Sequence, residues 1–173
     1  SSLITSTYPN IHNVKDWGYQ LNPDIHLYTL PEILRLHGYK TALISDQLAL
    51  SLIKGLEKGF VTYNTIWTYT FGPYSKKIIN ITDWAIDWLK NNKNDKFFLW
   101  LYYLDPHGPY APPAPYNKIF LNDEHYIIKQ NIPIADNDAQ SVVGEIPRYL
   151  AKNNITEVDY YISQYDGEIR YID

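Results

Sequence analysis

The apolar positions of this chain recur at helical spacing in some segments and form short uninterrupted runs in others. From Ser75 to a polar turn at 91–95, intervals of three and four residues predict a helix. Its repeating apolar residues are Ile78, Ile81, Ala85 and Trp88. Eight apolar and aromatic residues follow at 97–104. Such a run is typical of a central parallel strand that is buried on both faces.

An earlier segment predicts a helix followed by a strand. Thr29 is a candidate N-cap, Pro31 and Glu32 lie in the first turn, and Gly38 ends the helix. One face of this helix consists of Leu30, Ile33, Leu34 and His37. The short apolar run 40–45 then reads as a strand. Helix, glycine and strand make up half of a βαβ unit, so we expect an α/β fold with a mostly parallel sheet flanked by helices.

The remaining segments are less regular. Residues 1–7 resemble the end of a helix, and 10–28 read as a surface loop because they are rich in Asn, Gly and Pro. A second short helix is expected over 47–58, ending at Gly59. Residues 61–72 fit either strand or loop, and 117–150 are expected to form an irregular excursion over the surface.

A last helix is predicted at the end of the chain. Asn154 is its expected N-cap, with Glu157 at the third helical position. Its apolar residues recur at helical spacing, which predicts a buried stripe. That stripe consists of Val158, Ile162, Tyr165, Ile169 and Ile172.

Composition narrows the class of protein. A chain of 173 residues, 45% of them hydrophobic, is large enough for one globular domain with a real core. The net charge of −4 argues against a dedicated nucleic-acid binder, which would carry a basic face. The eight-residue run at 97–104 is the longest apolar run, far short of the ~20 residues that span a bilayer.

Two residue types are missing altogether. Without cysteine, residues 1–173 hold no disulfide, thiolate metal site or cysteine nucleophile. Without an initiator methionine, the chain is expected to be a processed product or a fragment. It also stops at Asp173 inside the last predicted helix, with no helix-ending residue. We therefore expect a segment cut at both ends.

Candidate chemistry lies where the predicted strands end. Ligands of open α/β sheets bind beyond the carboxyl ends of the strands, and Asp105 and His107 follow the 97–104 run. Five prolines within 106–115 stiffen this loop. A stiff loop that presents an imidazole and a carboxylate suits a general acid or a phosphate- or sulfate-binding group. The alternative is structural, with Asp105 capping the turn and His107 bonding a backbone carbonyl. Asp46 ends the other predicted strand and is a further candidate.

The other histidines carry weaker signals. His12 and His26 are expected at the surface, and His37 is expected to complement the dipole at its helix's C-terminus. His125 lies near two acidic residues, where a solvated acidic turn is favoured over a metal site. The chain has no His-x-x-x-His, Gly-rich phosphate loop or Gly-x-Ser-x-Gly motif.

Four blocks, in order along the chain, resemble the sulfatase family of the alkaline-phosphatase-like superfamily. Residues 1–14 read SSLITSTYPNIHNV, similar to the Leu-x-Thr-Gly-x-x-Pro stretch that follows the family's Cys-or-Ser-x-Pro-x-Arg signature. Residues 30–42 resemble the family's next helix and strand. Residues 97–113 resemble its strand and histidine loop, and YDGEIRYID at 165–173 resembles its Tyr-Asp-x-Glu-Ile helix.

The resemblance implies a mechanism. In this family a Cys or Ser of the signature becomes formylglycine, whose hydrate attacks sulfur while a divalent cation, usually calcium, holds the sulfate oxygens. A histidine on the loop matching His107 contacts the sulfate or leaving-group oxygen and helps protonate it. We therefore expect His107 to be catalytic. Asp105 and Asp46, which follow the predicted strands, and Tyr110, on the loop after Asp105, are expected to bind substrate.

Departures from the family pattern limit what carries over. Aligned on Leu3 and Thr5, the nucleophile signature would end just before Ser1, and the family's metal ligands fall outside the chain on both sides. No metal ligand is assigned here. Where many sulfatases have Gly-Lys-x-His, residues 45–48 read Ser-Asp-Gln-Leu, and Ser6 replaces the usual Gly.

We expect residues 1–173 to form the central part of one sulfatase-like catalytic domain. The intact protein is expected to hydrolyse a small-molecule or glycan sulfate ester, and this segment alone is expected to be inactive. One alternative is a phosphodiesterase, phosphonate hydrolase or phosphoglycol transferase on the same fold. Another is a non-catalytic binding module.

Overall fold

The computed structural model describes residues 1–16, 18–65, 81–126, 128–136 and 144–173. The chain divides into two compact units, Ser1–Leu104 and Asp105–Asp173, which are described one at a time. Among the described residues, no helix is both long and apolar enough to cross a membrane.

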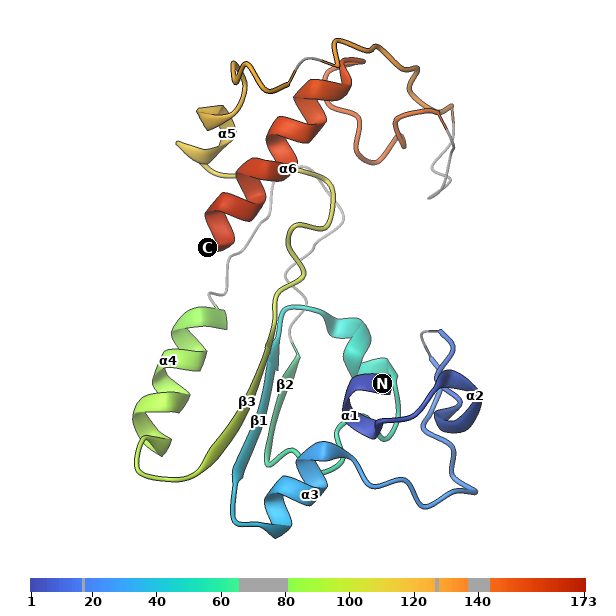
Figure 1. The fold of residues 1–173 in the computed structure, drawn as a ribbon, viewed down its shortest axis with the longest axis vertical. Coiled ribbons are helices and arrows are strands. Elements are labelled where there is room, and N and C mark those ends of the chain that lie inside the picture. Colours follow the sequence, from blue (N-terminus) through green and yellow to red (C-terminus); the bar gives the residue numbers. More distant parts are fainter. Residues whose placement is uncertain (17, 66–80, 127, 137–143) are drawn as a thin grey trace. The chain divides into compact units, whose positions relative to one another are not determined.

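The first unit is built on a parallel sheet of three strands in the order β2–β1–β3 (Figure 1). Strand β1 spans Lys40–Ser45, β2 spans Thr62–Thr65 and β3 spans Phe97–Tyr102. Both pairings of β1 are parallel. The predicted α/β class with a parallel sheet and flanking helices is confirmed.

The predicted position of the aromatic strand is wrong. Within the described sheet β3 lies at an edge and is only half-buried, with Phe97 and Tyr102 exposed. The central strand is β1, whose residues after Lys40 are all buried. A continuous apolar run shows that both faces of a strand are apolar, but it does not specify how many neighbours the strand has.

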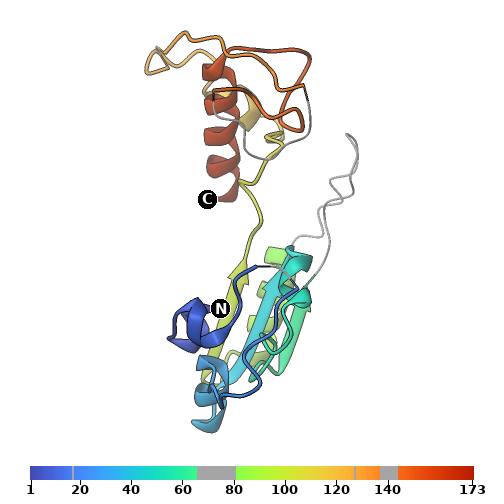
Figure 2. The ribbon, with the colours of Figure 1, turned by 90° about the vertical axis from the view of Figure 1, so that its right-hand side faces the viewer.

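Helices cover both faces of the sheet (Figures 1 and 2). Helix α4, Ile81–Asn92, packs on one face, where Ile44, Ile81 and Ala85 form a buried cluster. The part of this predicted helix before Ile81 lies outside the described residues. On the other face the Phe60 ring packs against Phe98, at a centroid distance of 6.2 Å. Helix α3 also contacts β1.

Helix α3, Leu30–Leu36, begins as the sequence predicts. Thr29 and Glu32 form a capping box, in which each side chain accepts a hydrogen bond from the other residue's backbone N–H. Of the helix face named from the sequence, Leu30 and Ile33 are exposed, whereas Pro31 is buried. The turn at 58–59 causes this orientation. It lies against the start of the helix, where the Thr29 hydroxyl donates to the Lys58 carbonyl oxygen at 2.8 Å.

The rest of the first unit departs partly from expectation. Two short helices, α1 (Ser2–Thr5) and α2 (Pro9–His12), occupy the start, so the expected 10–28 loop begins within α2. The helix expected over 47–58 is instead the 3₁₀ helix η1, Leu48–Leu52, followed by turns. Strand β2 accounts for the described part of the 61–72 segment.

In the second unit the structure describes helices α5 (Tyr116–Ile119) and α6 (Val158–Ile172). The described residues between them are irregular, as expected for most of 117–150, and residues 127 and 137–143 of that range lie outside the described residues. The expected cap of α6 is wrong. Glu157 is the N-cap, without a side-chain bond, and Asn154 lies in the left-handed region at φ 58°.

The predicted buried stripe of α6 is also wrong. Tyr165 and Ile169 are 38% and 39% exposed. The buried residues of the helix are Ser163, Gln164, Gly167 and Glu168. This face is buried because the proline-rich segment that follows Asp105 packs against it, as described next.

Candidate functional site

The proline-rich loop of the second unit carries three of the four predicted site residues: Asp105, His107 and Tyr110. The His107 side chain is exposed, and Asp105 is half-buried. His107 Nδ1 lies 2.8 Å from the Gly108 carbonyl oxygen. Because a carbonyl can only accept, Nδ1 carries the proton in this contact, and Nε2 carries the lone pair of the neutral ring. This contact is the backbone hydrogen bond of the structural alternative, and it also fixes which nitrogen points away from the backbone.

Tyr110 is held by aromatic neighbours. Its ring meets Tyr165 of α6 edge-on at a centroid distance of 5.4 Å. Burial, and secondarily Tyr149 and Tyr165, raise the pKa of the Tyr110 hydroxyl above its usual value. The hydroxyl therefore stays protonated at neutral pH and remains a hydrogen-bond donor.

Helix α6 holds the second half of the loop through its buried face. The Ala111 N–H donates to Glu168 Oε1 at 2.9 Å, and Gln164 Nε2 donates to the Asn117 carbonyl oxygen at 3.1 Å. A Cβ on Gly167 would lie only 2.7 Å from the Tyr116 carbonyl oxygen, so the loop backbone approaches the helix at a residue without a side chain.

The sequence offered a signal for this face that the apolar pattern concealed. Positions 164, 167, 168 and 171 recur at intervals of three, one and three, which places them on one side of a helix. Tyr171 continues the series, with its ring 5.5 Å from that of Tyr116. A buried carboxylate and amide at helical spacing indicate a helix that binds backbone groups of another segment.

Asp46 belongs to the first unit. It directly follows β1, and its Oδ1 accepts a hydrogen bond from the Leu104 N–H at 2.6 Å. Strands β1 and β3 are parallel neighbours, so this bond ties their carboxyl ends together. One oxygen of Asp46 thus fixes the backbone where the chain leaves the sheet.

His12, expected at the surface, is buried, with only 1% of its surface exposed. The Val14 N–H donates to its Nδ1 at 3.0 Å, so Nδ1 is unprotonated. Nε2 must then carry the proton of the neutral ring, and it lies 2.9 Å from Ser2 Oγ. Burial, and secondarily the nearby amino-terminal charge, lower the pKa of His12. Its side chain joins α1 to the end of α2.

The two other histidines of the first unit behave as expected. His37 Nδ1 donates to the Ile33 carbonyl oxygen at 2.8 Å, at the end of α3. His26 is exposed and meets the Tyr28 ring edge-on at 4.5 Å.

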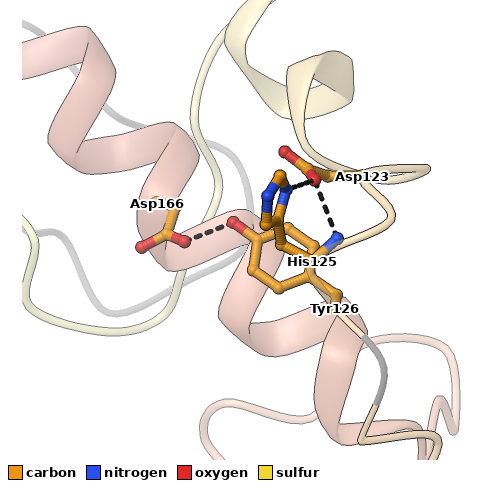
Figure 3. Close-up of polar contacts among 4 residues, drawn as sticks. All are labelled: Asp123, His125, Tyr126 and Asp166. Atoms are coloured by element: carbon orange, nitrogen blue, oxygen red, sulfur yellow. Dashed lines mark hydrogen bonds and ion pairs between the residues drawn. The ribbon is translucent and has the colours of Figure 1, made fainter.

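His125 lies in a polar cluster beside α6 (Figure 3). Its Nδ1 is 2.5 Å from Asp123 Oδ1, and the Tyr126 hydroxyl donates to Asp166. Burial and the Asp166 hydrogen bond raise the pKa of Tyr126 to about 12. Within the described ranges, no group of three or more His, Cys, Asp or Glu side chains fits a metal ion. The geometry is that of the expected acidic turn.

Comparison with known proteins gives one family. The sequence model of the sulfatase family matches residues 1–173. No curated protein matches the chain.

Two similar solved structures support the fold. The phosphonate monoester hydrolase SpPMH from Silicibacter pomeroyi has a TM-score of 0.67 at 15% identity, and the match covers 99% of this chain and 46% of that one. BT4656, solved in complex with its substrate D-glucosamine-2-N,6-O-disulfate, has a TM-score of 0.52 at 23% identity, covering 78% of this chain and 28% of that one. Both have alkaline-phosphatase-like folds. The chain spans less than half the length of either.

Proposed function

This chain belongs to the sulfatase family, and from that premise we propose that the full-length protein is a sulfuric ester hydrolase acting on a small-molecule or glycan sulfate ester. One observation carries the proposal. An exposed imidazole, His107, lies on a loop held by α6, within a chain that the family matches from end to end. A positioned imidazole at the carboxyl end of a strand suits proton transfer to a leaving group.

His107 is the proposed general acid. Its Nδ1–H donates to the Gly108 carbonyl oxygen, so Nε2 is the nitrogen that exchanges a proton with substrate. In the imidazolium form, Nε2–H gives its proton to the ester oxygen as the bond from sulfur to that oxygen breaks and sulfur bonds to the attacking nucleophile. The products of this step are the free alcohol, the sulfated nucleophile and a neutral imidazole. Asp105, Asp46 and Tyr110 are proposed substrate contacts, with the protonated Tyr110 hydroxyl as a donor.

The nucleophile, a formylglycine, and a divalent cation, calcium, are proposed to lie outside residues 1–173. The described residues do not fit a metal ion, because they contain no cluster of three or more suitable side chains. This segment alone is expected to be inactive for the same reason.

A second candidate function is hydrolysis of a phosphonate or phosphate ester. The observation that favours it is the likeness in shape to a phosphonate monoester hydrolase over 99% of this chain. The residues upstream of Ser1 separate the two functions. A Cys or Ser in a Cys/Ser-x-Pro-x-Arg signature favours sulfate ester hydrolysis, and an unmodified Thr or Ser in another context favours phosphoryl transfer.

The test uses the full-length protein with an alkyl sulfate, whose leaving group needs protonation, and with phenyl phosphonate esters. His107→Ala is expected to lower kcat for the preferred ester by about 10²- to 10⁴-fold, the usual contribution of a general acid. His26→Ala is the matched control, because His26 is also exposed but lies on another loop. Unchanged turnover in His107→Ala would contradict the role of His107 as general acid. No turnover of either ester by the wild-type protein would contradict the proposed activity and favour a binding module.

A further inference from the structure

The buried face of α6 approaches the histidine loop and the start of α5 at three successive points. Glu168 binds Ala111, Gly167 lies against Tyr116, and Gln164 binds Asn117. We propose that Glu168 is a positioning residue for His107, holding the loop through the Ala111 N–H so that the imidazole keeps its productive place. This inference rests on the proposed function, because it assigns a role within the same site.

The environment of Glu168 makes this contact strong. Only 1% of the residue is exposed. A buried carboxyl oxygen and a buried N–H are both costly to leave without a hydrogen bond, so the Ala111 N–H and Glu168 Oε1 keep each other paired. The bond to Ala111 is 2.9 Å long, a normal length for such a pair. The carboxylate therefore fixes the Ala111 backbone more tightly than an exposed side chain would.

The loop transmits this constraint to His107. Ala111 lies four residues after His107, and Pro109 stands between them with Pro112 and Pro113 directly after. Proline fixes φ, so the segment has few soft dihedrals and moves more nearly as one piece. Gly108 is also confined, because a Cβ there would lie 2.1 Å from Leu150 Cδ2. A shift at Ala111 consequently displaces the imidazole rather than being absorbed between the two residues.

The first experiment compares Glu168→Leu and Glu168→Gln in the full-length enzyme. Leucine removes the acceptor at similar size, whereas glutamine keeps an oxygen for the Ala111 N–H. Glu168→Leu is expected to lower kcat about 10- to 100-fold, because a displacement of ~1 Å at a catalytic group has effects of this order. Glu168→Gln is expected to stay within about threefold of wild type. Glu157→Leu, at an exposed N-cap without a side-chain bond, is the control and is expected to be unchanged.

Two further readouts separate positioning from general loss of structure. If Glu168 acts through proton transfer by His107, the loss is large for an alkyl sulfate and small for 4-nitrophenyl sulfate, whose leaving group needs little protonation. In a His107→Ala background, Glu168→Leu is expected to lower kcat no further. Equal losses on both substrates, an additive loss in that background, or Glu168→Gln as poor as Glu168→Leu would each overturn the inference.

A last measurement does not depend on activity. Hydrogen exchange of the peptide over 107–114 reports directly on the Ala111 amide, which is expected to exchange faster in Glu168→Leu than in Glu168→Gln. If the wild-type protein is inactive but this difference in exchange remains, the proposed function is refuted. The contact by which Glu168 fixes the loop then still stands. Equal exchange in the two variants refutes the proposal that Glu168 fixes the loop, whatever the activity.

Discussion

Replacing Gly59 with alanine tests how closely the turn at 58–59 packs on helix α3. Gly59 has φ +84°, and a Cβ there would lie 2.1 Å from the Glu32 backbone nitrogen and 2.6 Å from the Pro31 carbonyl carbon. Both neighbours are backbone atoms, so no side-chain rotation relieves the clash. The Gly59 carbonyl oxygen also accepts the Thr41 hydroxyl at 2.6 Å, which ties the turn to β1. The turn cannot move away without weakening that bond.

Gly38 is the matched control. Its φ of +80° is nearly the same, but a Cβ at Gly38 would meet nothing within 4 Å. Each substitution places a Cβ in the left-handed region, at about 1–2 kcal/mol. Overpacking at Gly59 adds roughly 1–3 kcal/mol. We therefore expect Gly38→Ala to lower the free energy of unfolding by about 1–2 kcal/mol, and Gly59→Ala by about 2–5 kcal/mol.

Urea unfolding of the 173-residue chain, followed by tryptophan fluorescence, measures this difference. All five tryptophans lie within residues 1–104, so the signal comes from tryptophans of the first unit. Equal losses in the two variants would refute the claimed close approach of the turn to α3. A loss in Gly59→Ala smaller than in Gly38→Ala would refute it more strongly.

Two other predictions use the same urea assay. Asp46→Leu leaves the Leu104 N–H without its Asp46 acceptor and is expected to lower the free energy of unfolding by about 1–3 kcal/mol. Asp46→Asn keeps an acceptor oxygen and is expected to lower it less. Equal losses of stability in the two variants would show that this hydrogen bond does not contribute. The lowered pKa of His12 means that the unfolded chain takes up its proton at higher pH than the folded chain. The contribution of His12 is therefore complete above pH ~6.5 and declines as pH falls towards its folded pKa. His12→Gln is expected to flatten this slope below about pH 6.5, and an unchanged slope would exclude His12 as its source.

Local signals predicted the start of α3 because every group involved is close in sequence. The side chains of Thr29 and Glu32 each accept a hydrogen bond from the other residue's backbone N–H within one turn. The start of this helix can therefore be predicted without knowledge of tertiary contacts. The same holds for the histidine loop, whose prolines exclude regular structure wherever the loop packs. The parallel sheet also followed from local order, since helix, glycine and strand leave few alternatives.

Tertiary contacts decided what the sequence could not predict. In α6 the apolar residues suggested one buried face, but the helix buries Gln164, Gly167 and Glu168 instead, because these bind or admit the backbone of the loop. The buried His12 side chain accepts a hydrogen bond from the Val14 N–H and contacts Ser2. No periodic pattern in the sequence indicates these two contacts. The edge position of β3 depends on strand order, which hydrophobicity does not specify.

The strand order has a consequence for synthesis on the ribosome. At ~5–20 residues per second, Thr62 of β2 emerges roughly 1–4 s after its partner Ala42. Phe97 of β3 emerges only roughly 3–12 s after Lys40, with which it pairs. One edge of β1 can thus pair with β2 early. At the other edge the backbone N–H and C=O groups stay unpaired, beside apolar side chains, until β3 has been made. A ribosome-bound chain that stops short of Phe97 presents this open edge to chaperones and to aggregating neighbours.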